Sequence, residues 1–447
     1  MSADTNQSPV TQDKYNFGFD SYIDSLETVI RKHLYSDNST KSLVIGLHAQ
    51  WGSGKTHLLE GIEQCVNHKN SEESIVIPVI FNAWRFEKEE HLIIPLLKSL
   101  YWKLDQKAQE EAQKSNKVKD TLKNTFELVK LSFFPIIQSI EKIKFLGLEL
   151  NNPTKEIRQN IKKYEENREK NKFKQQKLSY ESIYFDIVNQ ISEAAQKNGV
   201  KFLFLIDDID RCLPENSLRM LETMKLFLDI PHCAFVMAID KEVLELAIKH
   251  RYKEYIKEGQ SIPITASEYM EKIVTLPFSF PTIKQEDMKQ FIKNKYKTIR
   301  DKDIPNDILE AIQECVPLNP RKMIRTLELL NLKSILHSGE DERVLLIIAL
   351  IELFLPQLDR EIKRDIEQNK TDNILKEFCN QNSCVENIDE CLQNDNQMSQ
   401  KLKKILQEYK NSRNDFKLNK LINIIVGDDL LQKILSFLVG NKNAREN

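Results

Sequence analysis

A glycine-rich loop in the first part of the chain has the residue types that hold a polyphosphate. It reads AQWGSGKTH over Ala49–His57, and four of the eleven glycines lie within Gly46–Gly61. Backbone N–H groups can turn inward around a phosphate only where small residues and glycine conformations allow it. We expect Lys55 to reach the β- and γ-phosphates of a nucleotide and the Thr56 hydroxyl to ligate magnesium. The other expected nucleotide-binding residues are Trp51, Gly52, Ser53, Gly54 and His57.

A second cluster of reactive side chains follows the apolar run FLFLI and reads DDID, ending at Asp210. A buried strand that ends in acids delivers carboxylates to the edge of a sheet. We expect Asp207 to hold the magnesium-bound water shell and Asp208 to orient or activate the attacking water. Aspartate is one carbon shorter than the glutamate often found at the second position, so the placement of that water can differ.

Three more residues could serve the same reaction. Arg211 could pair with Asp210 or touch a phosphate from a neighbouring subunit, and Asp240 ends a later strand where a sensor of the γ-phosphate commonly sits. Arg321 opens a helix in PLNPRKMIRTLELL and could contact the γ-phosphate from a helical lid. For each of the three, a structural ion pair is the alternative.

These side chains need a parallel sheet to bring them together. Short apolar runs predict four buried strands, and helical patterns lie between them, which is typical of a parallel sheet covered on both faces. After Pro281 the strand signals fade and helical periodicity continues to the last residues. The four predicted strands are Lys41–Ala49, Ile75–Trp84, Lys201–Asp210 and His232–Asp240.

Composition bears on the partners and the cellular compartment of the protein. The net charge is −2, so global charge gives no argument for a nucleic-acid or membrane partner. The polar N-terminus lacks the pattern of a secretory signal, and seven cysteines, an odd count, suggest reduced thiols in the cytoplasm. No stretch reaches the roughly 18 apolar residues that a membrane-spanning helix needs, so we expect no transmembrane segment.

One segment interrupts the alternation of strands and helices. Lys103–Lys177 holds 18 basic and 11 acidic residues, a local charge of +7. We expect an inserted helical arm. A solvated helical excursion is one interpretation, and a contact surface for nucleic acid, acidic lipid or another subunit is the other.

Taken together, the motifs make the chain similar to the KAP family of P-loop NTPases. FNAW after the second strand and DDIDR after the third are specific in combination. The resemblance implies a three-layer α/β core of the additional-strand, catalytic-glutamate type with a helical lid, and ATP as the preferred nucleotide. The motifs are FGFDSYIDSLETVI (Phe17–Ile30), WGSGKT (Trp51–Thr56), FNAWRFE (Phe81–Glu87), IDDIDRC (Ile206–Cys212), YMEKIVTLPFSFP (Tyr269–Pro281) and NPRKMIR (Asn319–Arg325).

The chain departs from the family pattern in two places. Ala49 stands where the phosphate loop usually begins with glycine, which leaves the first turn of the loop open. Family members often carry transmembrane helices before the third-strand motif, whereas the insertion here is charged. The family includes a phage-exclusion protein and many bacterial proteins near defence genes. The FNAWRFE segment should lie near the nucleotide, where Asn82 or Arg85 could brace the acids; aromatic packing of Trp84 and Phe86 is the alternative.

We therefore expect a magnesium-dependent ATPase that drives conformational change or assembly, as a homo-oligomer with partner proteins of a bacterial anti-phage defence operon. A nucleotide-gated scaffold with little turnover and an ATP-dependent nucleic-acid-binding protein are the alternatives. The expected domains are a P-loop core (1–102 and 178–282), a charged helical insertion (103–177), a helical lid (283–340) and a helical C-terminal region (341–447).

Overall fold

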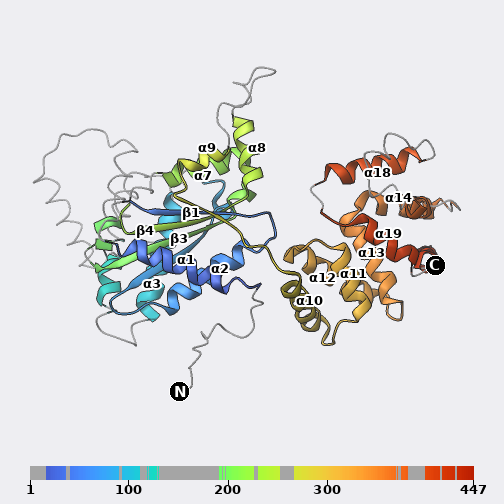
Figure 1. Cartoon of the computed structure of the whole chain (residues 1–447), viewed down its shortest axis with the longest axis horizontal. Helices are drawn as coiled ribbons and strands as arrows, with labels where there is room; N and C mark the ends of the chain where they lie inside the picture. Colours follow the sequence, from blue (N-terminus) through green and yellow to red (C-terminus); the bar gives the residue numbers. More distant parts are fainter. Residues whose placement is uncertain are drawn as a thin grey trace, which may run out of the picture. The chain divides into compact units, whose positions relative to one another are not determined.

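The structure is a computed structural model that divides into two compact units (Figure 1). The α/β unit comprises Asp20–Trp51 and Lys55–Phe280, and the helical unit comprises Pro281–Asn447 together with Met1–Phe19 and Gly52–Gly54. The described residues are 17–36, 41–89, 93–110, most of 118–129, most of 191–225, 230–251, 266–368, 370, 374–380, 398–412, 415–427 and 430–446.

Five parallel strands form the sheet of the α/β unit, in the order β2-β3-β4-β1-β5. The order places β4 between β1, which precedes the phosphate loop, and β3, which carries the acids. This is the additional strand that the resemblance implied, so the predicted fold class is confirmed. The strands are β1 (Leu43–His48), β2 (Ile75–Asn82), β3 (Val200–Asp207), β4 (Cys233–Ile239) and β5 (Leu276–Ser279).

The first four strands match the predicted ones, and β5 was not predicted. The central strands β3 and β4 are buried at every position, because helices cover both faces of the sheet. The edge strand β5 is four residues long, contains Pro277 and is mostly exposed. A short edge strand with a proline lacks the continuous apolar run that marked the others.

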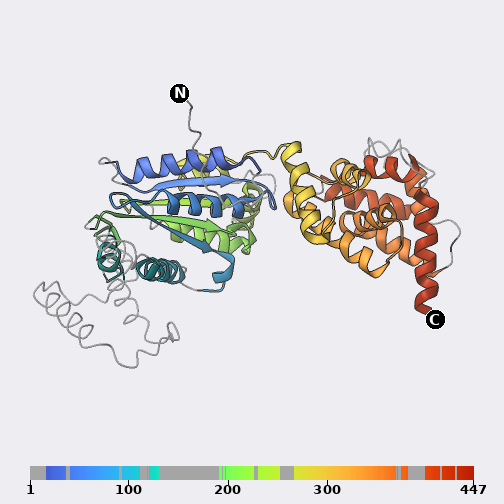
Figure 2. The same cartoon turned by 90° about the horizontal axis from the view of Figure 1, so that it is seen from below.

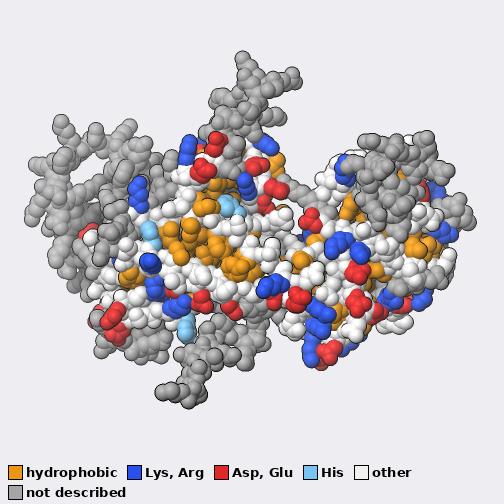
Figure 3. Space-filling view, in the orientation of Figure 1, with side chains coloured by type: hydrophobic (Ala, Val, Ile, Leu, Met, Phe, Trp, Pro, Cys, Tyr) orange, Lys and Arg blue, Asp and Glu red, His pale blue; other side chains and the backbone are white. Residues whose placement is uncertain are grey.

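Helices pack on both faces of the sheet (Figure 2). On one face α1 (Asp20–Leu34) and α2 (Lys55–His68) contact each other and the strands. Apolar side chains gather on the surface over these two helices (Figure 3), where Tyr22 and Val29 of α1 are exposed. On the other face lie α3 (Ile93–Glu110), α7 (Pro214–Lys225) and α8 (Lys241–Arg251), and α9 (Ala266–Glu271) contacts α8.

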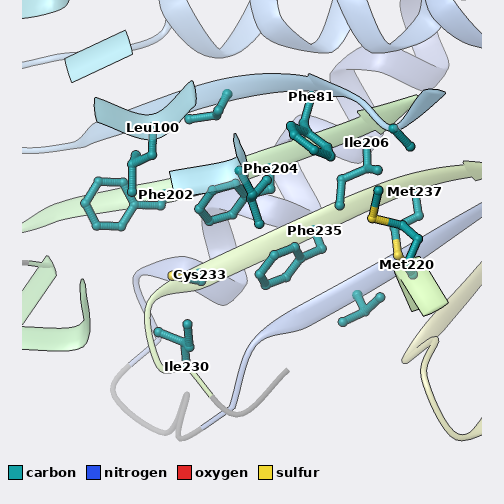
Figure 4. Close-up of a cluster of buried hydrophobic side chains, with 14 of the residues drawn as sticks. Phe81, Leu100, Phe202, Phe204, Ile206, Met220, Ile230, Cys233, Phe235 and Met237 are labelled. Atoms are coloured by element: carbon teal, nitrogen blue, oxygen red, sulfur yellow. The ribbon is translucent and has the colours of Figure 1, made fainter. Parts of the chain in front are cut away.

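Aromatic and aliphatic side chains fill the core between the sheet and the helices α3, α7 and α8 (Figure 4). Phe204 of β3 and Phe235 of β4 stack with their ring centroids 5.0 Å apart. Leu122 and Val129, from the first part of the predicted insertion, are buried in the same core. This part of the insertion therefore belongs to the packing of the α/β unit, while residues 130–177 lie outside the described residues.

The helical unit confirms the predicted helices after Pro281. Asn319 caps α12 by accepting a hydrogen bond from the backbone N–H of Lys322, and Pro320 takes the first helical position. None of the helices among the described residues is long and apolar enough to cross a membrane. The helices are α10 (Gln285–Arg300), α11 (Asn306–Cys315), α12 (Pro320–Leu336), α13 (Glu342–Phe354), α14 (Pro356–Glu367), α15 (Ile374–Asn380), α18 (Gln400–Asn411), α19 (Leu418–Gly427) and α20 (Leu430–Glu446).

Candidate nucleotide-binding site

The phosphate loop connects β1 to α2 at the carboxyl edge of the sheet. Gly52 has φ of 84° and Gly54 has φ of 108°, both in the region that favours glycine. Ala49 does not have a positive φ, and its N–H donates to the carbonyl of Ile239 at the end of β4. The missing first glycine therefore leaves the backbone of the loop without strain at that position, and the glycines that the loop needs are present.

Lys55 begins α2 and its ammonium group is buried. Its Nζ donates hydrogen bonds to Oδ2 of Asp210 at 2.6 Å and to the carbonyl oxygen of Ala49 at 3.1 Å. The side chains of Lys55 and Asp210 are only 7% and 4% exposed, so the ion pair is shielded from water. Lys55, the cation expected to bind phosphate, is therefore bonded to the first residue of the loop and to Asp210.

Thr56 and Asp207 lie side by side, as a shared magnesium site requires. The Thr56 hydroxyl donates to Oδ2 of Asp207 at 2.6 Å, and Oδ1 of Asp207 accepts from the backbone N–H of Asp208 at 2.8 Å. A hydroxyl and a carboxylate are hard oxygen donors, the type that Mg²⁺ prefers. The donor set at this position fits the expected cation.

Asp208 adopts a left-handed backbone conformation, with φ of 58° and ψ of 27°. Asparagine and aspartate are among the few residues other than glycine that occur there. The conformation ends β3 abruptly and starts a short 3₁₀ turn, Ile209–Arg211. The Ser217 hydroxyl fixes that turn by donating to the carbonyl of Ile209 at 2.8 Å. As a result, the three carboxylates of DDID point to different partners.

The Asp208 carboxylate has a polar partner on each oxygen. Asn82, the last residue of β2, donates from Nδ2 to Oδ2 at 2.6 Å. Nε of Arg211 lies 2.6 Å from Oδ1, although its N–H is not aligned for a hydrogen bond. Burial raises the pKa of the Asp208 carboxyl, the charge of Asp207 raises it further, and the bond from Asn82 offsets part of the rise. A carboxyl with a raised pKa is better suited to accept a proton than an ordinary aspartate.

The FNAWRFE segment forms a second short 3₁₀ turn, η1 (Trp84–Phe86), beside the acids. Of the two residues expected to brace them, Asn82 does so through its side chain, while Arg85 donates its backbone N–H to Oδ1 of Asn82. Phe86 stacks on Phe81 at 5.2 Å and so has a packing role. Trp84 is 51% exposed, and the Arg211 guanidinium lies 5.6 Å from its ring centre.

A further set of contacts joins this segment to the turn after β3. Glu87 accepts hydrogen bonds from the backbone N–H of Leu213 and from Nδ2 of Asn216. Arg219 donates to the carbonyls of Glu87 and Glu89. The sequence did not predict these contacts: Glu87 ends the FNAWRFE motif, but Leu213, Asn216 and Arg219 stand in no recognisable spacing.

The remaining candidates have other partners or belong to other elements. Asp240 follows β4, is buried, and caps α8 by accepting from the N–H of Glu242 at 3.0 Å. Arg211 pairs with Asp208 and not with Asp210, which is a correction of the pairing considered from sequence. His57 interacts electrostatically with Asp20 of α1, and Trp51 is exposed in the loop beside Ser53. Arg321 is the second residue of α12, in the helical unit.

Residues 19–335 match the KAP family P-loop domain, which is more than half of the chain. The chain belongs to the KAP family of P-loop NTPases. This membership supports nucleotide binding and, in general, nucleotide hydrolysis.

Two relatives of known sequence are similar over parts of the chain. An uncharacterised protein of Methanocaldococcus jannaschii is 25% identical over 178 residues, covering 34% of this chain and 83% of that protein. The phage T7 exclusion protein of Escherichia coli is 20% identical over 303 residues, covering 65% of this chain. The match spans only 36% of the exclusion protein's own length.

Two solved structures are similar at low identity. Cdc6p of Pyrobaculum aerophilum aligns with a TM-score of 0.41 and 11% identity, over 97% of each chain. The ORC2 protein of Aeropyrum pernix aligns with a TM-score of 0.40 and 11% identity, over 99% of this chain and 97% of that one. Nothing about the activity of the KAP-family chain follows from TM-scores this low.

Proposed function

We propose that this KAP-family protein hydrolyses ATP with Mg²⁺. The observation that carries the proposal is the separation of three carboxylates within four residues. Asp207 contacts the Thr56 hydroxyl, Asp208 contacts Asn82 and Arg211, and Asp210 contacts Lys55. Phosphoryl transfer needs a metal ligand, a residue that positions water and a cation for the phosphates. The three partners correspond to these three needs.

Thr56 and Asp207 would hold the magnesium ion. When bound, the ion neutralises charge on the phosphate oxygens. Mg²⁺ keeps several waters and takes only one or two protein ligands in such sites, so a threonine and an aspartate suffice. The backbone N–H groups of the loop and the N-terminus of α2 supply the complementary positive field for the phosphates.

The chemical step assigns a defined task to each remaining residue. The oxygen of a water molecule attacks the γ-phosphorus, and the bond from that phosphorus to the β–γ bridging oxygen breaks. ADP and inorganic phosphate result. Asp208 accepts the proton of the water and returns it to solvent, while Lys55 balances the charge on the phosphates. ATP is preferred over GTP by family resemblance, and the sequence has no guanine-specifying Asn/Thr-Lys-x-Asp motif.

The direct test is turnover and binding in the purified full-length chain. Lys55→Ala should abolish both ATP binding and hydrolysis, whereas Asp208→Asn should bind ATP and fail to release phosphate. Hydrolysis that is undetectable in the wild type, alone and with DNA or partner subunits added, would exclude the enzymatic function.

The biological setting that we propose is an oligomeric complex of bacterial anti-phage defence in the cytoplasm. Support comes from the sequence similarity to the phage T7 exclusion protein. A nucleotide-gated scaffold with little turnover is the alternative, and a phage-challenge assay separates the two. If Asp208→Asn cells resist phage as well as wild-type cells, hydrolysis is dispensable and the scaffold is favoured. Nucleic-acid binding by the basic insertion stays a prediction from its charge.

A further inference from the structure

Asp210 forms an ion pair with the Lys55 ammonium group, which is the cation expected to bind the nucleotide phosphates. Its Oδ2 accepts from Lys55 Nζ at 2.6 Å, and the same ammonium group donates to the Ala49 carbonyl. Both charged side chains are almost fully buried. Burying an ammonium group without a counter-ion is costly, so this carboxylate stabilises the buried Lys55 side chain.

A bound triphosphate would bring several negative charges to the same ammonium group. Lys55 has three N–H donors, of which Ala49 takes one and Asp210 another. A phosphate oxygen must therefore displace Asp210 or share Lys55 with it. In the second case two anions repel each other in a buried site, where the repulsion is stronger than in water. Either way, Asp210 opposes part of the attraction between Lys55 and the nucleotide.

The turn that carries Asp210 keeps this carboxylate in place. Asp208 in its left-handed conformation directs the chain into the turn, and Ser217 ties the turn down through the carbonyls of Ile209 and Cys212. Asp210 itself is one of the three turn residues. The carboxylate is thus held by backbone geometry and is ready to return to Lys55 when the phosphate leaves.

We propose that Asp210 is a positioning residue that neutralises Lys55 in the empty site, competes with the nucleotide phosphates for it, and so sets the affinity for the triphosphate. The inference rests on the proposed ATP binding. The nucleoside triphosphate should lose the most affinity to this competition, because Lys55 reaches both the β- and the γ-phosphate. The diphosphate should lose less. After hydrolysis the return of Asp210 to Lys55 should favour release of the product.

The test is Asp210→Asn in the full-length chain, with equilibrium binding of fluorescent ATP and ADP analogues. The variant keeps the size of the side chain and an oxygen acceptor for Lys55 but removes the negative charge. We expect the affinity for ATP to increase by about tenfold or more, since tenfold is at the low end of the effect of changing a buried charge interaction. The affinity for ADP should increase less. Product release, followed by stopped flow, should slow.

The matched control is Glu27→Gln in α1. Glu27 is also a buried carboxylate with two cationic partners, Arg31 at 2.6 Å and Lys69 at 3.0 Å. A general effect of losing a buried ion pair would lower the melting temperature in both variants and leave the ATP affinity of Glu27→Gln at the wild-type value. Only the competition that we propose tightens ATP binding in Asp210→Asn alone.

Other outcomes decide against the inference. If Asp210→Asn folds and binds ATP with wild-type or weaker affinity, Asp210 does not compete for Lys55. Weaker binding only with Mg²⁺ present, and unchanged binding in EDTA, would assign Asp210 to the metal instead. Should Asp210→Asn fail to fold, Asp210→Ser, which admits water beside Lys55, carries the same expectation. A wild type that binds no nucleotide would contradict the proposed function itself.

Discussion

Asn82 Nδ2 donates a 2.6 Å hydrogen bond to Oδ2 of Asp208, and this bond joins the end of β2 to the acid that follows β3. The two strands are neighbours in the sheet, with Asn82 in register with Asp207. The amide therefore orients the carboxylate from the adjacent strand. Removing it leaves Asp208 with its charge but without its orientation.

We predict that Asn82→Ala lowers kcat by roughly 10- to 100-fold, as is common for partners that orient a reactive group, and leaves KM for ATP nearly unchanged. Steady-state kinetics measure both. Asn216→Ala is the control, because Asn216 bonds Glu87 in the neighbouring contact and does not touch the acids. Equal loss of kcat in the two variants would show that Asn82 acts only through the packing of this region.

The raised pKa of Asp208 makes both activity and stability depend on pH. Burial and the charge of Asp207 raise it, so Asp208 binds its proton more tightly in the folded than in the unfolded chain. Above the folded pKa the buried charge destabilises the fold, and below the unfolded pKa this cost disappears. The proton-accepting form is lost as pH falls through the folded pKa, which lies above that of an ordinary aspartate.

We predict that Asp208→Asn raises the melting temperature near pH 7, by about 2–4 °C for each kcal/mol of relieved destabilisation, and that the gain shrinks toward acid pH. Thermal unfolding across pH measures it. Asp301→Asn is the control, since Asp301 also has a left-handed backbone but is exposed. A gain that is the same at every pH would argue against relief of a buried charge.

Lys55 and Asp210 should also be coupled in stability. Lys55→Met leaves the Asp210 carboxylate buried without its cation, which typically costs about 3–5 kcal/mol in free energy of unfolding. We predict that adding Asp210→Asn to Lys55→Met recovers most of this loss. Urea unfolding of both single variants and the double variant measures the coupling energy. Additive losses would mean that the pair contributes nothing to the fold.

The contribution of the Thr56 hydroxyl can be tested separately from the contribution of the side-chain volume. Thr56→Val removes the oxygen that lies 2.6 Å from Asp207 and keeps the volume. We predict that about tenfold or more Mg²⁺ is then needed for half-maximal turnover, while nucleotide binding in EDTA is retained. Thr28→Val in α1, where the hydroxyl bonds only a backbone carbonyl of its own helix, should leave the Mg²⁺ requirement unchanged. An unchanged requirement in Thr56→Val would remove Thr56 from the metal site.

Much of the fold could be predicted because buried parallel strands are continuous apolar runs, as in FLFLI of β3. The strand β5 lacks such a run, since it is only four residues long and mostly exposed. In the site, the positions of Lys55 and Thr56 at the start of a helix and of Asp207 at the end of a strand could be predicted from the sequence, and the structure brings Thr56 and Asp207 together. Their roles in binding phosphate and magnesium stay predictions.

The pairing of Asp210 could not be predicted, because it depends on the backbone angle of Asp208. An aspartate can be left-handed or extended, and sequence alone does not decide between them. With the left-handed angle, Asp210 meets Lys55 and Arg211 meets Asp208. The same uncertainty explains why Arg211 pairs with Asp208 and not with Asp210, the partner considered for it from the sequence.

The Arg211 guanidinium that lies over Trp84 gives the chain a spectroscopic reporter. The chain has three tryptophans, and Trp84 is half exposed beside a cation whose other partner is Asp208. Indole emission is sensitive to a nearby charge and to water. When Arg211 moves away from Asp208, the environment of Trp84 changes with it. In a chain with Trp51 and Trp102 replaced by phenylalanine, the intrinsic fluorescence of Trp84 would report whether Arg211 is paired with Asp208, without any attached dye.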